Sequence, residues 1–453
     1  MGFAQGVSAL SASAANLDVI GNNIANAGTI GFKSGSVQFA DVYAGSQVGL
    51  GTKVAGVAQN FTAGSVQSST RPLDVAITNG DGFFRLASAS GEIAYSRNGQ
   101  FNVDKNGFMV NAAGLNLTGF PVTATGTIAG GSPTALQFPT AAMAPKPTDA
   151  IAAQFNLDSR STAIPAATAF DAKDSKTYSY ANAVSVFDSL GNSHELVTFF
   201  RNASTPATAA TAGPPATAAI PAINSWKVYA TADGQALDAK GVIVPSTTPP
   251  TAASPLSITV ASPTPTTSTT LTFDSNGVLP FDPATGQPYK VTVGLAGLDF
   301  GNGSTAMAFD MNLTGTTQFG NDNAVNKLTQ TGYASGVLTS YAVGQDGIVT
   351  GKYSNEQTKT LGQIVLSSFI NPNGLQSKGD NVWAATSDSG QPLTGKPGSG
   401  TKLGALTSGA LEGSNVDLTS ELVNLIIAQR TYQANSQTVK TQDQIMQTLI
   451  NMR

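Results

Sequence analysis

Apolar residues at the start of the chain recur at alternating steps of four and three residues, which places them on one face of an α-helix. The last two members continue this stripe on a slightly drifted face. The spacing therefore predicts one amphipathic N-terminal helix, and its apolar stripe consists of Phe3, Val7, Leu10, Ala14, Leu17, Ile20 and Ile24.

The end of the chain carries the same alternation over a longer stretch. Polar residues Gln429, Ser436 and Asp443 occupy three intervening positions of the stripe. Asp417 is placed to cap the helix, and Glu421 follows in the first turn, near the positive end of the helix dipole. A helix from Asp417 to the end of the chain would be about 55 Å long at about 1.5 Å per residue. Its apolar stripe consists of Leu418, Leu422, Leu425, Tyr432, Val439, Met446 and Ile450.

The two stripes allow two interpretations. Amphipathic helices commonly pack inside their own domain, so an intramolecular helix pair is the first. Polar residues within a helical seam cost stability but fix register and partner number, which is frequent where helices meet other copies of themselves. The polar seam positions favour the second interpretation, an assembly seam between copies, and the intramolecular pair stays open as the alternative.

Between the two ends the period of the pattern falls to two, and turn dipeptides separate short β-branched or aromatic runs. The turns include Asn79-Gly80, Asp81-Gly82 and Asn98-Gly99. The pattern predicts strands at 73–77, 83–86, 93–96, 101–103, 184–187 and 196–200. The fold class is therefore α+β, with long terminal α-helices that form a coiled-coil-like core and mainly β domains nested in the middle of the chain.

Two segments of low complexity interrupt this β region. They contain Ala, Thr, Ser and Pro without charged residues, and paired prolines break any hydrogen-bonded ladder. We expect long loops or outward insertions at 204–221 and 245–270, and a glycine-rich connector at 390–407.

Composition excludes several classes of function. Only 11% of the 453 residues are charged and the formal net charge is -4, so there is no basic field for nucleic acid or anionic lipid. There is no cysteine, which excludes thiolate nucleophiles, cysteine-ligated metals and disulfides. The single histidine, His194, is too little for a multi-histidine metal site, and we expect it to be solvated beside a turn.

The sequence carries no signal for membrane insertion or for cleaved secretion. It has no run of about 18 apolar residues that could span a membrane. The first basic residue is Lys33, so the N-terminus lacks the charged region of a cleaved secretory signal. If the protein leaves the cytoplasm, we expect another route to carry it.

Three near matches to chemical motifs lack essential residues. Segment 395–402 has the lysine and hydroxyl of a phosphate-binding loop in the wrong order, and segment 102–107, which we expect to be a hairpin turn, resembles a calcium loop without its closing carboxylate. His194-Glu195 lacks the second histidine of a zinc pair. We therefore expect no catalytic, cofactor-binding or metal site and no small-molecule substrate. A carboxylate-based glycosidase stays open as an alternative, because Asp and Glu total 27 although no pair is marked.

Distinctive motifs lie at both ends of the chain. The N-terminal motif is Leu17-Asp-Val-Ile-Gly-Asn-Asn-Ile-Ala-Asn26, followed by Thr29-Ile-Gly-Phe-Lys33. Further stretches are 96–101, 117–121, 353–357, 361–364, 408–412 and 414–417. Together they resemble the signature of the bacterial flagellar rod and hook protein family. The family-motif residues are Asn22, Asn23, Asn26, Gly31, Phe32 and Lys33.

The resemblance covers the chain up to about Pro121 and again from Tyr353 onward. The length and the middle insertion resemble the hook proteins rather than the shorter rod proteins. The resemblance implies a structural protein that polymerises into a curved tube. Such a tube is a flexible universal joint that transmits torque from rod to filament and encloses the export channel.

The resemblance also implies a division of the chain into nested parts. By similarity, the terminal helical core is 1–30 with 412–453 and the linkers are 31–70 with 366–411. The inner β domain is 71–144 with 329–365, and the inserted outer β domain is 145–328.

Implied partners are other copies of the chain, the distal rod protein, the hook cap protein, the hook-filament junction protein and the flagellar type III export apparatus. The implied location is the flagellar hook and basal body, outside the cell, reached without a cleaved signal peptide. Two further alternatives stay open. A distal rod protein has the same ends, and a secreted β-rich surface adhesin would explain the Thr- and Ala-rich middle but not the paired terminal seams.

Overall fold

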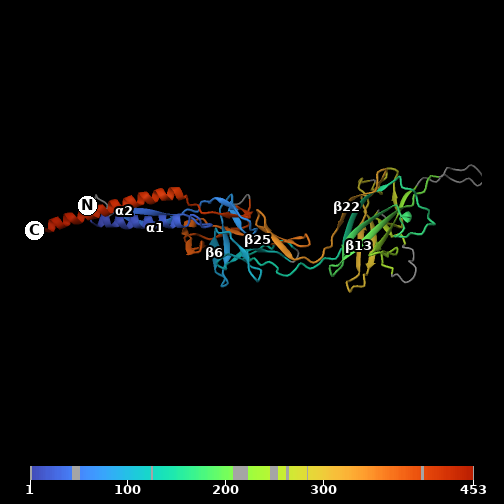
Figure 1. Cartoon of the computed structure of the whole chain (residues 1–453), viewed down its shortest axis with the longest axis horizontal. Helices are drawn as coiled ribbons and strands as arrows, with labels where there is room; N and C mark the ends of the chain where they lie inside the picture. The colour runs from blue at the N-terminus through green and yellow to red at the C-terminus, as the bar shows by residue number, and fades with distance from the viewer. Residues whose placement is uncertain are drawn as a thin grey trace, which may run out of the picture. The chain divides into compact units, whose positions relative to one another are not determined.

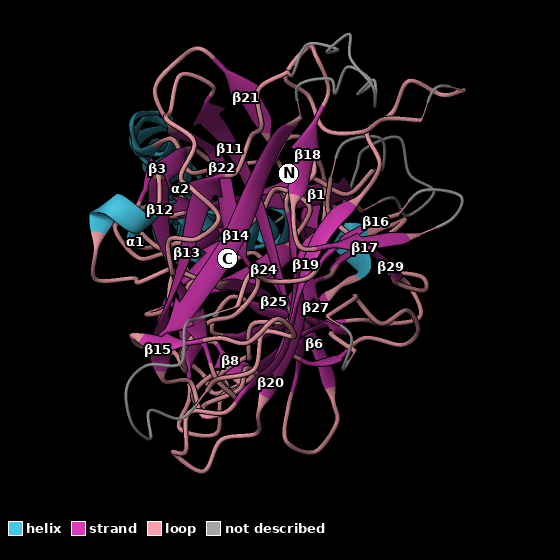
Figure 2. Cartoon of the chain, turned by 90° about the vertical axis from the view of Figure 1, so that its right-hand side faces the viewer, coloured by secondary structure: helices cyan, strands magenta, loops and turns pink. Residues whose placement is uncertain are grey.

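A computed structural model of the chain describes residues 3–42, 51–123, 126–207, 223–244, 254–261, 265–282, 284–398 and 402–451. In these residues β-sheet dominates and two α-helices lie at the two ends of the sequence, as the pattern predicted (Figure 2). The chain forms two compact units. Unit 1 contains Met1–Ala141 and Leu338–Arg453, and unit 2 contains Ala142–Val337. The chain therefore leaves unit 1, builds unit 2 and returns to unit 1.

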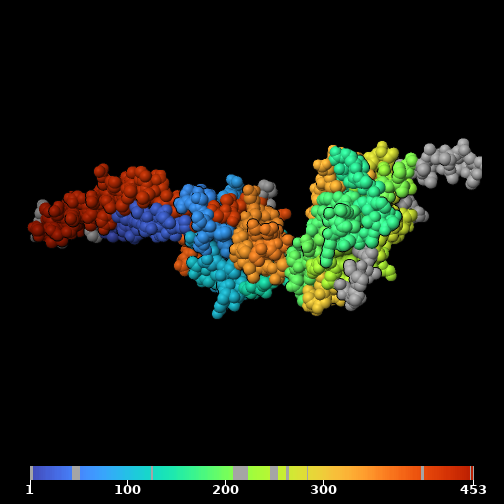
Figure 3. Space-filling view, turned by 45° about the vertical axis from the view of Figure 1, so that its right-hand side comes forward, coloured from blue at the N-terminus to red at the C-terminus, as the bar shows by residue number. Residues whose placement is uncertain are grey.

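The two helices of unit 1, α1 (Phe3–Ala25) and α2 (Leu418–Asn451), lie side by side and run antiparallel (Figure 1). Asp417 caps α2 as predicted: its Oδ1 accepts hydrogen bonds from the backbone N–H groups of Thr419 at 2.9 Å and Ser420 at 3.4 Å. At about 1.5 Å per residue, the 34 residues of α2 span about 51 Å and the 23 residues of α1 about 35 Å. The longer helix thus extends beyond the shorter one, as the space-filling view shows (Figure 3).

The strands of unit 1 form one large sheet and several small ones. In the large sheet the main order is β23-β24-β25-β9-β5-β6-β28-β27, and β1 with β2 forms a separate antiparallel hairpin against α1. The elements are β1 (Gly35–Asp41), β2 (Thr52–Gln59), β3 (Val66–Ser68), β4 (Val75–Thr78), β5 (Phe83–Ala87), β6 (Ile93–Ser96), β7 (Asn102–Val103), β8 (Met109–Val110), β9 (Asn116–Pro121), β10 (Thr134–Ala135), β23 (Leu338–Val343), β24 (Ile348–Tyr353), β25 (Thr358–Ile364), β26 (Leu366–Ser368), a 3-10 turn (Pro372–Gly374), β27 (Gln376–Gly379), β28 (Val382–Ala384), β29 (Leu393–Gly395), β30 (Ala405–Ser408) and β31 (Ala410–Glu412).

Unit 2 is a pair of sheets around one core. One sheet has the order β17-β16-β19-β20-β11-β21 with β22 on β11, and the other has the order β12-β13-β14-β15 with β18 on β14. The elements are β11 (Ala150–Asp158), a 3-10 turn (Ser175–Thr177), β12 (Tyr180–Phe187), β13 (Ser193–Asn202), β14 (Asn224–Ala232), β15 (Gln235–Ala236), β16 (Ile258–Val260), β17 (Thr266–Ser268), β18 (Leu271–Phe273), β19 (Val291–Leu298), β20 (Met307–Asn312), β21 (Thr317–Phe319) and β22 (Ala324–Gln330).

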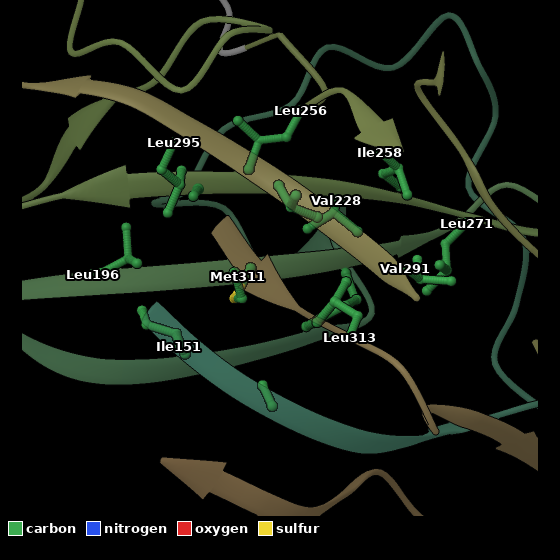
Figure 4. Packing of buried hydrophobic residues seen from close by; sticks show 14 of the residues in the cluster. Ile151, Leu196, Val228, Leu256, Ile258, Leu271, Val291, Leu295, Met311 and Leu313 are labelled. Carbon is green, nitrogen blue, oxygen red and sulfur yellow. The ribbon is translucent and has the colours of Figure 1, made fainter. Parts of the chain in front are cut away.

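The core of unit 2 lies between these two sheets. Its buried side chains come from both, because alternate residues of each strand point inward. Figure 4 shows ten of them packed together: Ile151, Leu196, Val228, Leu256, Ile258, Leu271, Val291, Leu295, Met311 and Leu313.

Several loop expectations were wrong. The described part of the expected loop at 245–270 contains β16 and β17, which pair with each other, and Ile258 of β16 is fully buried in the core of unit 2. The expected connector at 390–407 contains β29 and most of β30, and Leu406 is fully buried in the core of unit 1. Most of the expected loop at 204–221 lies outside the described residues. Segment 102–107 is a hairpin turn, as expected, with Asp104 Oδ1 accepting from the N–H groups of Asn106 and Phe108.

The ranges expected as linkers also contain regular structure. β1, β2 and β3 lie in 31–70, and β26 to β31 lie in 366–411. Several of these strands join sheets of the β body, since β26 pairs with β5, β28 pairs with β6 and β30 pairs with β4. The contacts divide the described chain into two units and do not separate core, linker and inner β domain inside unit 1.

Candidate assembly interface

The helices α1 and α2 meet through small and polar side chains. Ala12 and Ser13 of α1 and Ala428 of α2 are buried there. A Cβ added at Gly6 would lie 2.7 Å from Val439 Cγ2, so the two backbones approach closely at this point. Asn435 Nδ2 also donates a hydrogen bond to Ser13 Oγ at 3.3 Å. The intramolecular helix pair therefore exists, and small and polar residues take part in its contacts.

The large apolar residues of α2 instead remain largely exposed. Among the predicted seam positions, Leu418, Leu422, Tyr432, Met446 and Ile450 are between 40% and 69% exposed, while Leu425 and Val439 are half-buried. The sequence pattern missed further exposed apolar residues on the same helix. These are Val423, Ile426, Ile427 and Ile445.

The seam positions on α1 also differ in how exposed they are. Val7 is exposed, Leu10, Leu17 and Ile24 are half-buried, and Ile20 is buried. The side chain of Phe3 lies outside the described residues. The helix pair thus presents an apolar surface for which the described part of the chain provides no cover.

The family-motif asparagines tie α1 to its neighbours. Asn23 is buried; its Nδ2 donates to Gly35 O at 2.8 Å and to Glu421 Oε1 at 3.2 Å, and its Oδ1 accepts from Gly35 N at 2.9 Å. Asn26 Nδ2 donates to Asn22 O and to Asn22 Oδ1, both at 3.0 Å, which closes the end of α1. One side chain, Asn23, therefore joins α1, the first strand and the first turn of α2.

The glycine and lysine of the motif lie at the junction between helices and β body, with Phe32 half-buried between them. Gly31 has φ +71°, and a Cβ there would lie 2.6 Å from the backbone N of Asn98, so only glycine fits. Lys33 is fully buried. Its Nζ lies 2.6 Å from Glu412 Oε1 and donates to Thr62 O at 2.7 Å.

Glu412 is the centre of this buried cluster. Its Oε1 also accepts from the backbone N of Gly64 at 3.0 Å, and its Oε2 lies 3.3 Å from Arg97 Nη1. Burial lowers the pKa of Lys33 below its ordinary value of 10.5, although the pairing with Glu412 opposes the shift. We call Lys33, Arg97 and Glu412 the junction cluster. Sequence reasoning assigned no role to Arg97 or Glu412, yet each is a charged residue inside a recognised family stretch of a weakly charged chain.

A groove of about 600 Å³ lies between α1, α2 and the β1–β2 hairpin. Its lining contains both small residues and larger apolar ones. Among the described residues that line it, the one charged side chain is Glu421. The lining residues are Ala9, Ala12, Ser13, Asn16, Val19, Ile20, Asn23, Gly35, Ser36, Val37, Phe39, Thr52, Glu421, Asn424, Ile427, Ala428, Thr431 and Asn435.

The expectation of a solvated histidine was wrong. His194 is buried in unit 2, with Nδ1 2.7 Å from Asp233 Oδ2, Nε2 3.2 Å from Asp188 Oδ2 and its ring stacked on Phe300. Burial raises the pKa of Asp188, but hydrogen bonds from Asn192 and Asn302 outweigh it and hold that pKa well below its usual range. The ring contacts Phe300, Asp188 and Asp233, so a position beside a turn did not mean exposure.

Within the described residues, no group of three or more His, Cys, Asp or Glu side chains is placed to hold a metal ion. Neither helix that the structure describes is long and apolar enough to cross a membrane. The phosphate-loop near match at 395–402 lies partly outside the described residues.

Four family models match the chain, in an order that follows its architecture. They are "Flagella basal body rod protein" at residues 5–33, "Flagellar hook protein FlgE/F/G D1 domain" at 76–157, "Flagellar basal body protein FlaE D2 domain" at 156–333 and "Flagellar basal body rod FlgEFG protein C-terminal" at 407–452. The fold and these matches define a protein of the flagellar rod and hook class.

Relatives that align over their full length are hook proteins rather than rod proteins. The flagellar hook protein FlgE of Salmonella typhimurium is 45% identical over 456 residues, covering 100% of both chains, and that of Escherichia coli K12 is also 45% identical over 456 residues. The solved structure of Helicobacter pylori flagellar hook protein FlgE2 aligns with a TM-score of 0.47 and 13% identity, over 76% of this chain and 100% of that chain. The chain belongs to the flagellar hook protein family and has the structural role of the hook. The matches do not favour a distal rod protein or an adhesin.

Proposed function

We propose that copies of this chain polymerise through the exposed apolar faces of α1 and α2, so that the terminal helices form a coiled-coil-like inner layer of the hook tube. The observation that carries the proposal is the set of large apolar side chains on α2 that are at least 40% exposed in the single chain. Fully burying a leucine contributes about 1.5–3 kcal/mol, so burying the exposed part of several such residues in every subunit favours assembly. Leu418 and Leu422 are seam residues in this proposal.

The contact between copies is heterologous: one patch of a subunit meets a different patch of the next. Such contacts do not close on themselves and generate helical arrays. The length of the tube must then be limited by other proteins. By family resemblance these partners include the distal rod protein, the hook cap protein and the hook-filament junction protein.

The parts of the chain outside the helices serve the flexibility of the joint. In the proposed division, 1–30 with 412–453 is the core, 31–70 with 366–411 links it to the inner β domain at 71–144 with 329–365, and 145–328 is the outer domain. A bending tube must let neighbouring subunits shift past one another, and a surface with only 11% charged residues offers few ion pairs that would fix one register. The joint bends because these outer contacts adjust while the helical layer holds.

We propose a purely structural role for the chain. The chain acts without catalysis, cofactor or small-molecule substrate, and it binds no nucleic acid. It reaches the hook through the flagellar type III export apparatus without a cleaved signal peptide. The family's structural role and the low charge of the chain support these points.

Electron microscopy of the purified chain after a polymerisation trigger tests the proposal. We expect curved tubes with a central channel, and cells with the gene deleted should lack the hook while their rods remain. A purified chain that stays folded and never forms tubes at any concentration would contradict self-polymerisation.

A further inference from the structure

The last turns of α2 have no partner in the described part of the chain. Because α1 and α2 are antiparallel and Gly6 lies against Val439, the first described residue of α1 lies near residue 442 of α2. We call residues 445–451 the overhang. Ile445, Met446 and Ile450 are all more than half exposed there, and Met446 and Ile450 stand one turn apart on the same face.

The groove between α1, α2 and the β1–β2 hairpin has matching properties. Its lining includes the small residues Ala9, Ala12 and Ala428 and the larger apolar residues Phe39 and Ile427. Both of these larger residues are about half exposed, so the single chain does not fill the space.

The overhang cannot reach the groove of its own chain. The groove is lined by α2 itself as far as Asn435, and α2 continues as one helix to Asn451. Ile445 therefore lies about 15 Å further along the same rod, at about 1.5 Å per residue. An occupant with the chemistry of the overhang must come from another copy.

Charge does not oppose this contact. Glu421 is the one charged residue among the described lining of the groove, and it already accepts a hydrogen bond from Asn23. Among the residues of the overhang, 445–451, none is charged. Bringing the two together therefore places one carboxylate, hydrogen-bonded to Asn23, beside an uncharged segment and introduces no like-charge repulsion.

From these observations we infer that the overhang of one copy seats in the groove of another copy, with Met446 and Ile450 as the inserted side chains. The inference rests on the proposed self-assembly and names the two patches that meet. Since the patches differ, each copy has one of each to offer, and the contact propagates without closing. The occupant is a second copy of this chain.

Cysteine cross-linking tests the inference cleanly, because the natural chain has no cysteine. One batch of chain carries Phe39→Cys in the groove, and a second carries Ile450→Cys in the overhang. The two are mixed, polymerised and oxidised, and the products are separated under denaturing conditions. Thr448→Cys replaces Ile450→Cys in the control, since residue 448 is on the opposite side of the helix.

We expect a covalent dimer from Phe39→Cys with Ile450→Cys, and its loss with Thr448→Cys, because a disulfide needs Cα atoms within about 7 Å. If the first pair does not polymerise, Ser36→Cys with Met446→Cys tests the same contact. Tubes that form normally but give no dimer with either pair would overturn the inference and leave the proposed function intact. Natural chain that forms no tubes would instead contradict the proposed function.

Discussion

Large apolar side chains are buried in unit 2 but are largely exposed on the terminal helices. In unit 2, Phe155, Phe200 and Trp226 are at most 1% exposed, because two sheets of the same chain cover them. On α2, Leu422, Ile427 and Ile450 are between 45% and 69% exposed. Unit 2 therefore completes its core within one chain, whereas the helices carry apolar surface that the described part of the chain leaves uncovered.

The junction cluster differs from both regions, because its buried side chains are charged. It is charged, yet Lys33, Arg97 and Glu412 are each at most 3% exposed. It ties the chain after α1 and the chain before α2 to the β body of unit 1.

The largest expected effect comes from Leu422→Asp. The variant places a carboxylate in an apolar contact that recurs in every subunit, where desolvation costs several kcal/mol. We expect polymerisation to be abolished while the thermal unfolding of the soluble chain is almost unchanged, since Leu422 is 45% exposed. Asn373→Asp, in an exposed turn, is the control and should pellet like the natural chain. If Leu422→Asp still formed tubes at the usual concentration, α2 would not be part of the seam between copies.

Glu412→Gln should affect the stability of the single chain rather than its contacts. It leaves Lys33 and Arg97 buried without a carboxylate, so we expect the free energy of unfolding of unit 1 to fall by about 3–5 kcal/mol. Glu92→Gln is a matched control, since Glu92 pairs with Lys378 at the surface and should cost less than about 1 kcal/mol. Urea unfolding measures both, and equal losses would mean that burial of the cluster has no energetic consequence.

Asp417→Ala should have a smaller effect at the start of α2. It removes the side chain that accepts from Thr419 and Ser420, and an N-cap of this kind contributes about 1 kcal/mol. In tubes, amide exchange should become faster in the first turn of α2 and stay the same at its centre. Asp417→Asn keeps an acceptor and should behave almost like the natural chain. An unchanged first turn in Asp417→Ala would show that the cap does not hold it.

A pH dependence, confined to alkaline solution, is expected from Lys33. Its pKa is lowered in the folded chain, so between that lowered value and 10.5 the unfolded chain holds a proton that the folded chain has lost. Stability from this group therefore rises with pH in this interval, by at most about 1.4 kcal/mol per unit of lowering. Urea titrations should show that the free energy of unfolding of the natural chain increases relative to that of Lys33→Met as the pH rises. A difference that falls with pH would contradict the assigned direction.

Sequence patterns predicted the elements with clear periodicity. The helical stripes at both ends, the Asp417 cap and the strands near 83–86 and 93–96 lie where the spacing placed them. Composition failed at 245–270, because Ile258 and Leu256 enter the core of unit 2 from a Thr- and Pro-rich segment. The low complexity of the surrounding residues predicted a loop, so the burial of these two residues was not expected.

The site was only partly predictable for a different reason. Periodicity finds apolar faces, but it cannot tell which face of α2 meets α1 and which stays free. The small residues Gly6, Ala12 and Ala428 decide this, and they give no hydrophobic signal. The junction cluster joins residues 33, 97 and 412, whose pairing depends on long-range contacts that no local pattern records.

The central claim is that the apolar faces of the terminal helices are buried only in the polymer. Amide hydrogen exchange of α2, compared between soluble chain and tubes, tests it most directly. A helix with an uncovered apolar face gains little from tertiary packing, so amides near Leu418, Leu422 and Met446 should exchange quickly in the soluble chain and slowly in tubes, while strands of unit 2 stay protected in both. Strong protection of α2 in the soluble chain, with no further change in tubes, would contradict the claim.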